Sequence, residues 1–146
     1  MTGINKEPTR SFGWGAALLG GAVAIAGAAF LGTLAANVRL RMSLAEGQST
    51  EQAYAALAAS SGPMDVLLSL ATLALPCAAG GYLSAKRGRG HALVQAGVAG
   101  AVALLFVVVV YLNPSSQPGP QWFIGLSLVT PVFSSVLGGW LYVRKI

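Results

Sequence analysis

The chain has 146 residues, of which 55% are hydrophobic and 9% are charged. A soluble globular domain carries about 25% charged residues, so this composition excludes one, and four membrane spans of about 20 residues each would use over half of the chain. The nine basic and four acidic residues give a formal charge of +5, but the basic residues gather in pairs at the ends of apolar segments, which is typical of membrane topology signals and not of a nucleic-acid surface.

The N-terminal part is predicted as a polar cytoplasmic tail, residues 1–11, followed by a first membrane span, residues 12–36. The apolar segment is too long for the core of a signal peptide, so we expect it to be retained. Small side chains recur in it at every fourth position, and helical geometry places them close to one line. We interpret this line, called the ladder below, as a helix-packing face formed by Ala16, Gly20, Ala24, Ala28, Gly32 and Ala36. The alternative is a generic alanine-rich span without a packing role.

The segment after the first span, residues 37–63, is predicted as an extracytoplasmic loop, and its first part, Val38 to Leu44, can continue as helix into the interface. Ser49 and Gln52 have the spacing of a capping box, and apolar residues follow them at helical spacing. This pattern predicts a short amphipathic helix over residues 50–59, lying either at the membrane surface or in a solvated loop.

Three further apolar segments predict three further spans. Proline cannot donate a backbone hydrogen bond, so Pro76 is expected to kink the second span. The spans and their connections are residues 64–84, a cytoplasmic turn at 85–91, residues 92–112, an extracytoplasmic loop at 113–121, and residues 122–143. We therefore expect one all-α integral membrane domain over residues 1–146.

Lysine and arginine are distributed unevenly between the two sides of this predicted domain. Seven lie in the tail, the 85–91 turn and the C-terminal end, two lie in the 37–63 loop, and none lies in the 113–121 loop. Cytoplasmic segments carry the excess of positive charge, so both termini are predicted to face the cytoplasm from the inner membrane of a bacterial cell.

The segment Leu68–Arg87 recurs without a gap as Leu126–Lys145. Both copies contain LSL, a threonine two positions later, two adjacent glycines followed by an aromatic residue, and a terminal basic pair. Each repeat is interpreted as an out-and-back hairpin, and two such hairpins in tandem are parallel, related by a pseudo-twofold axis along the membrane normal. The predicted architecture is a four-helix bundle of two hairpin repeats. Chance similarity between two apolar segments is the alternative.

Hydroxyl side chains follow one stripe of the second and fourth spans. The stripe residues are Ser69 and Thr72 in the first copy and Ser127, Thr130 and Ser134 in the second. Such side chains form hydrogen bonds between membrane helices, worth about 0.6 kcal/mol each. The stripes therefore indicate either packing contacts or a polar lining for a small solute or ion.

Asp, Glu, Lys, Arg and His are almost absent from the predicted spans. Only Asp65, in the first turn of the second span, lies within one. Proton-coupled carriers, voltage sensors and metal transporters usually need such groups near the bilayer centre. Catalysis by a hydroxyl needs a base beside it, and a metal needs several ligands. We therefore predict no enzymatic activity, no metal site and no cofactor. Cys77, the single cysteine, and His91, the single histidine, are interpreted as a packing residue and an interface residue.

A positive rim is predicted at the cytoplasmic face. Its members are candidate contacts for anionic lipid: Lys86, Arg87, Arg89, Arg144 and Lys145. Each basic residue near such a surface contributes about 1 kcal/mol of attraction to anionic headgroups. Topology alone would also account for the rim.

Two functions remain open at this point. The first is a non-enzymatic protein that acts through helix–helix contacts, either as an accessory or assembly subunit of a membrane complex or as a homo-oligomer, with the ladder as its contact face. The second is a small channel or facilitator whose path follows the hydroxyl stripes. Both functions place the protein in the lipid bilayer and involve no nucleic acid. The first also requires another membrane protein or a second copy of the chain as partner.

Overall fold

A computed structural model describes residues 12–59, 62–88, 91–113 and 121–145. All elements in this part of the chain are helices: α1 (Trp14–Ala45), α2 (Thr50–Ala59), α3 (Pro63–Arg87), α4 (Ala92–Leu112) and α5 (Gln121–Val143). Four of them, α1, α3, α4 and α5, are long and apolar enough to cross a bilayer. The protein is therefore an all-α, multi-pass membrane protein. The predicted tail at 1–11, Arg89 and most of the 113–121 loop lie outside the described residues.

Helix α1 is longer than the predicted first span. Its 32 residues correspond to about 48 Å at about 1.5 Å per residue, whereas the hydrocarbon core of a bilayer is about 30 Å thick. Residues 37–45, predicted as the start of a loop, continue the helix because no helix breaker occurs before Gly47, whose φ of 85° is a conformation that favours glycine. The last turns of α1 therefore extend beyond the membrane.

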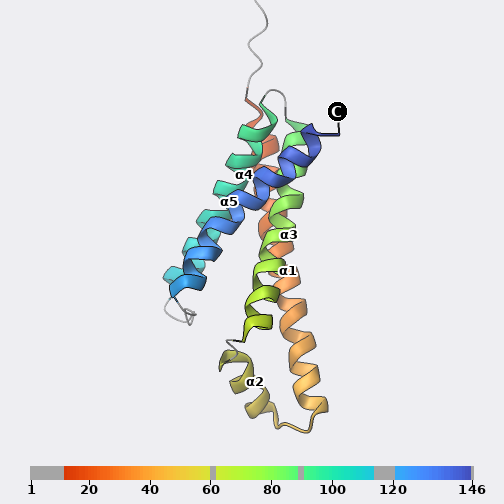
Figure 1. Cartoon of the computed structure of the whole chain (residues 1–146), viewed down its shortest axis with the longest axis vertical. Coiled ribbons are helices and arrows are strands. Elements are labelled where there is room, and N and C mark those ends of the chain that lie inside the picture. Colours follow the sequence, from red (N-terminus) through yellow and green to blue (C-terminus); the bar gives the residue numbers. More distant parts are fainter. Residues whose placement is uncertain (1–11, 60–61, 89–90, 114–120, 146) are drawn as a thin grey trace, which may run out of the picture.

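Helix α2 occupies the range in which the sequence predicts a loop helix. The Ser49 backbone N–H donates to Gln52 Oε1 at 3.1 Å, and the Gln52 backbone N–H donates to Ser49 Oγ at 3.3 Å. This reciprocal pair is the capping box expected from their spacing. Ala53 is fully buried, and α2 lies beside the last turns of α1 (Figure 1).

Helix α3 begins one residue before the predicted second span and ends three residues after it. Pro63 stands in its first turn, where no N–H is needed, and Asp65 Oδ2 accepts a hydrogen bond from the Gly62 N–H at 3.3 Å. At the other end Lys86 and Arg87 form the last turn, where positive charge suits the helix dipole. Lys86 and Arg87, which lie in the predicted turn at 85–91, thus stabilise one more turn of α3.

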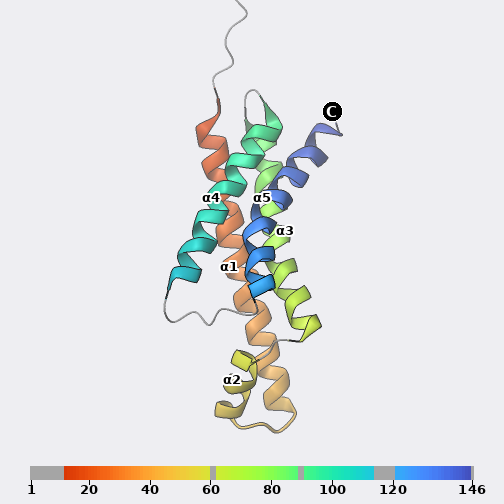
Figure 2. The same cartoon turned by 60° about the vertical axis from the view of Figure 1, so that its left-hand side comes forward.

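The four spans form two antiparallel hairpins, α1–α3 and α4–α5, that meet at one end and diverge toward the other (Figures 1 and 2). We call the meeting end, with the starts of α1 and α4 and the ends of α3 and α5, the upper end. The opposite end, which carries α2, is the lower end. Helix α3 packs against α1, α4 and α5, and α4 also packs against α1 and α5. The two hairpins therefore share one core near the upper end.

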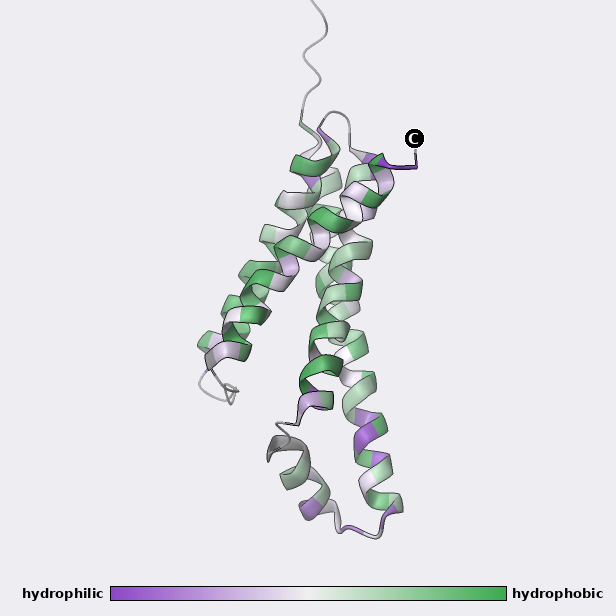
Figure 3. Cartoon of the chain, in the orientation of Figure 1, coloured by the Kyte–Doolittle hydropathy of each residue, from purple (hydrophilic) through white to green (hydrophobic). Residues whose placement is uncertain are grey.

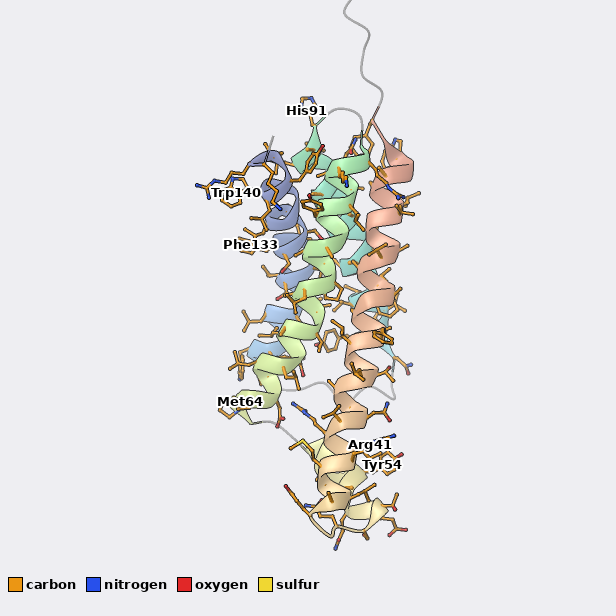
Figure 4. All side chains as sticks on the ribbon, turned by 90° about the vertical axis from the view of Figure 1, so that its right-hand side faces the viewer. Arg41, Tyr54, Met64, His91, Phe133 and Trp140 are labelled. Atoms are coloured by element: carbon orange, nitrogen blue, oxygen red, sulfur yellow. The ribbon has the colours of Figure 1, made fainter. Side chains whose placement is uncertain are left out.

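The core consists of small side chains, and the large apolar side chains point away from it. Ala17, Ala24, Cys77, Ala96 and Ala99 are fully buried. Large side chains such as Phe30, Leu105 and Phe133 are more than 60% exposed, and Figure 4 shows Phe133 directed away from the neighbouring helices. Figure 3 shows the hydrophobic colouring along the spans and the most hydrophilic residues near the two ends. This is the distribution expected when lipid, not water, surrounds the helices.

The two hairpins are not related by exact symmetry. A twofold axis that exchanges α1 with α4 and α3 with α5 would make the α3–α4 and α1–α5 pairs equivalent. Within the described residues α3 packs against α4, whereas α1 and α5 do not approach each other. The two hairpins contain similar sequence segments but do not make equivalent contacts with each other.

Candidate functional site

Helices α3 and α5 cross with their backbones in close contact. A Cβ atom at Gly81 would collide with the Ser135 carbonyl, and one at Gly138 would collide with the Ala78 carbonyl. The buried Ser135 Oγ also donates to the Cys77 carbonyl oxygen at 2.9 Å. Ser135 and Cys77 are 58 residues apart, which is the offset between the two similar segments, so positions that the predicted repeat aligns meet here.

The adjacent glycines of each copy contact two different helices. In α3, Gly80 faces α1, where its added Cβ would collide with the Gly20 carbonyl, and Gly81 faces α5. In α5, Gly138 faces α3, whereas a Cβ at Gly139 would lie 2.5 Å from Ala96 Cβ of α4. Neighbouring residues of a helix point about 100° apart, so a glycine pair allows close packing on two sides. In α3 the first glycine of the pair, Gly80, contacts α1 of the same hairpin. In α5 the first glycine, Gly138, contacts α3 of the other hairpin.

The ladder on α1 has a buried part at Gly20 and Ala24, an open part around Gly32 toward the lower end, and a half-buried residue, Ala16, near the start of the helix. Gly20 and Ala24 are buried, and a Cβ at Gly20 would lie 2.5 Å from the Gly80 carbonyl oxygen and 3.2 Å from Ala99 Cβ. These two positions are therefore covered by α3 and α4 of the same chain. Ala16, Ala28, Gly32 and Ala36 are half-buried, and a Cβ at Gly32 would have no atom within 4 Å.

The threonines of the hydroxyl stripes make hydrogen bonds within their own helices. Thr72 Oγ1 donates to the Ser69 carbonyl at 2.9 Å, and Thr130 Oγ1 donates to the Leu126 carbonyl at 2.7 Å. Each threonine thus satisfies its hydroxyl within its own helix.

The serines of the stripes differ in environment. Ser69 is exposed, whereas Ser127 and Ser134 are buried. Ser127 Oγ donates to the Ile124 carbonyl at 2.9 Å and is 2.7 Å from the Tyr111 hydroxyl of α4. The aligned residues Ser69 and Ser127 therefore lie in different environments, and Ser127 contacts Tyr111 of its own hairpin.

A second polar contact joins α3 to α4 at the upper end. Ser84 and Gln95 are fully buried, and Ser84 Oγ donates to the Gln95 carbonyl oxygen at 3.1 Å. The Gln95 side chain lies beside Gly88, where a Cβ would collide with it. The sequence marks Gln95 as polar within a span but does not indicate which helix it contacts.

An ion pair at the lower end joins α1 to α3. Arg39 Nη2 lies 2.5 Å from Asp65 Oδ1, and the two side chains are 25% and 29% exposed. The sequence shows Arg39 as one of two basic residues in the 37–63 segment and Asp65 in the first turn of the second span, without connecting them. Their position at the facing ends of one predicted hairpin is the signal that could have done so. The pair neutralises one of the two positive charges near this end.

The upper end gathers basic and aromatic side chains from α3 and α5. Tyr82 and Tyr142 make an edge-to-face contact with ring centroids 5.6 Å apart, and Lys145 Nζ lies 6.0 Å from the centre of the Tyr82 ring. The Arg144 guanidinium carbon lies 4.8 Å from the centre of the Trp140 ring. We call Lys86, Arg87, Arg144 and Lys145 with these three aromatic residues the upper basic cluster. All four basic side chains are exposed.

In the described part of the chain, the features available for function are helix-packing surfaces and exposed basic side chains. Its residues contain no group of three or more His, Cys, Asp or Glu side chains that could hold a metal ion. Its interhelical hydrogen bonds are made by hydroxyls to carbonyls or to another hydroxyl. The candidate sites are therefore the open part of the ladder and the upper basic cluster.

Comparison of the chain with protein-family models, with curated proteins and with solved structures gives no match.

Proposed function

We propose that the protein acts through helix–helix contacts in a bacterial inner membrane, with both termini in the cytoplasm, as an accessory or assembly subunit of a membrane complex or as a homo-oligomer. The observation that carries the proposal is the open part of the ladder at Gly32. A Cβ at this position would meet no atom of the chain within 4 Å, although glycine lowers helix stability by about 1 kcal/mol relative to alanine in a soluble helix.

The buried part of the same ladder shows how small residues allow helices to pack closely in this protein. Gly20 and Gly80 bring the backbones of α1 and α3 together, and this contact is internal to the chain. Toward the lower end α4 diverges from α1 (Figures 1 and 2), so the α1 surface around Gly32 loses that neighbour. A helix from another protein or a second copy could approach there as α3 does at Gly20.

The channel or facilitator alternative receives less support. A polar path needs hydroxyls that face one another, whereas Thr72 and Thr130 donate to carbonyls of their own helices. Ser69 is exposed, and Ser127 bonds with the Tyr111 hydroxyl of α4. We therefore place the function in contact surfaces and not in the hydroxyl stripes.

The test is chemical crosslinking in native membranes, followed by native mass spectrometry in mild detergent, on the wild type and two variants. Gly32→Leu fills the open part of the ladder, and we expect it to remove the oligomer or the co-purified partner while leaving the monomer folded. Gly125→Leu is the matched control, because a Cβ at Gly125 also meets no atom within 4 Å and it lies on α5, away from the ladder. A wild type that is strictly monomeric and without a partner would refute the proposal, and so would equal loss in both variants.

A further inference from the structure

The ends of α3 and α5 carry a charge arrangement that helix packing does not require. The repeat places a basic pair at the end of each copy, and the fold brings both pairs to the upper end (Figure 1). Among the described residues the carboxylate side chains are Glu46, Glu51 and Asp65, all at the lower end. Asp65 and Lys86 are separated by 21 residues of α3, or about 32 Å. The described carboxylates therefore cannot neutralise the upper basic cluster.

The cationic groups of α5 are held against aromatic rings. Backbone hydrogen bonds from Arg144 N–H to the Trp140 carbonyl at 3.0 Å and from Lys145 N–H to the Tyr142 carbonyl at 3.1 Å continue the last turn of α5. This turn places Arg144 beside Trp140 and Lys145 beside Tyr82 of α3. Cation–π attraction favours these positions over ones in which the long side chains extend into water.

Complementing the helix dipole accounts for only part of this arrangement. Lys86 and Arg87 stand in the last turn of α3, where positive charge is favourable. Lys145, however, contacts a ring of a different helix, and this contact depends on the Tyr82–Tyr142 pair that joins the two helix ends. Tyrosine and tryptophan prefer the depth of the lipid headgroups, so the cluster lies where phosphate groups are abundant.

We propose that the upper basic cluster is a binding site for the phosphate of an anionic phospholipid headgroup, formed jointly by the ends of α3 and α5. Lys145 and Arg144 donate to the phosphate oxygens, Lys86 and Arg87 add positive potential, and the Tyr82 ring positions Lys145. This site goes beyond the helix contact proposed above and does not depend on it, because Gly32 lies in the middle of α1 (Trp14–Ala45), about 27 Å along the helix from its upper end.

The experiment measures retention of phosphatidylglycerol and of phosphatidylcholine with the same acyl chains by native mass spectrometry of the purified full chain in detergent. We expect the wild type to retain phosphatidylglycerol preferentially and Lys145→Gln to reduce this retention about fivefold, the equivalent of about 1 kcal/mol per basic residue at a membrane surface. Arg41→Gln is the matched control, since it removes one exposed positive charge at the lower end (Figure 4). Equal retention of both lipids by the wild type, or an equal loss in Lys145→Gln and Arg41→Gln, would overturn the site.

Two further arms separate a structured lipid site from simple charge and from a free anion site. Tyr82→Leu removes the ring beside Lys145 without changing the charge and is expected to lower phosphatidylglycerol retention, whereas Tyr82→Phe keeps the ring and the retention. Unchanged retention in Tyr82→Leu would contradict the role of the ring. Sodium phosphate and sodium chloride of equal ionic strength are expected to displace the lipid equally. Specific displacement by phosphate would identify a site for the free anion and overturn the assignment to lipid.

Discussion

At Gly138 the absence of a side chain allows the backbone of α5 to reach the Ala78 carbonyl of α3. In water, apolar burial would hold such helices together, but lipid is as apolar as the side chains and gives little of that driving force. Close backbone packing and hydrogen bonds such as that from Ser135 Oγ to the Cys77 carbonyl take its place. Small residues in the core are therefore the expected means of stabilising this protein.

Gly138→Ala is expected to destabilise the protein, because the new methyl group must displace backbone atoms of α3. Overpacking of this kind costs about 1–3 kcal/mol. Gly125→Ala is the control on the same helix, where a Cβ meets no atom within 4 Å, and no loss of stability is expected. Reversible unfolding of both variants with sodium dodecyl sulfate, followed by circular dichroism, measures the difference. Equal stability of the two variants would show that the crossing is looser than described.

At the scale of the elements, the divergence of the two hairpins distinguishes this protein from a bundle of parallel-packed spans. Helices α3 and α5 meet around Cys77 and Ser135 and again through Tyr82 and Tyr142. Toward the lower end they separate, as Figure 1 shows. The prolines Pro76 and Pro131 lie in the middle of α3 and α5, where a missing backbone hydrogen bond permits a helix to bend.

Spin labels on α3 and α5 are expected to lie farther apart at the lower end than at the upper end. With Cys77 replaced by alanine, one pair of labels is placed at the exposed Leu67 and Trp122, and the other at the exposed Lys86 and Lys145. Pulsed electron spin resonance in lipid nanodiscs measures both distances. Equal distances would indicate that the hairpins are closed in a bilayer.

At the scale of the whole molecule, charge is segregated between the two ends. The upper end carries four exposed basic side chains, and the lower end carries the described carboxylates with the Arg39–Asp65 ion pair. Figure 4 places His91 and Trp140 near the upper end and Arg41 and Tyr54 near the lower end. Because the positive side of a membrane protein usually faces the cytoplasm, the upper end is predicted to do so.

This orientation is tested with single cysteines in a Cys77→Ala background. A cysteine at Ser49, in the connection between α1 and α2, is expected to react with a membrane-impermeant maleimide added to intact cells. A cysteine at Lys86 is expected to react only after the membrane is permeabilised. The reverse pattern would invert the topology and would place the upper basic cluster outside the cell.

Much of the fold follows from the sequence because it depends on local properties of the chain. Length and hydropathy of the apolar segments predict the four spans, and the all-α membrane fold is confirmed. The capping box at Ser49 and Gln52 acts within a few residues, so the start of α2 can be predicted from the sequence. Helix α1 continues past the predicted span because polar residues such as Asn37 can remain helical outside the hydrocarbon. Its amide donates to the Thr33 carbonyl at 2.8 Å.

What only the tertiary structure decided is which side of each helix meets which neighbour. Gly20 and Gly32 belong to one ladder in the sequence, yet α3 and α4 cover the first and leave the second open. Ser69 and Ser127 occupy aligned positions of the two similar segments, yet one is exposed and the other contacts Tyr111. Helical periodicity specifies which residues share a face, but the crossing point and tilt of two helices depend on atoms that are distant in the chain. In a membrane, where apolar faces are nearly equivalent, only close packing at residues such as Gly81 and Gly138 selects among the arrangements.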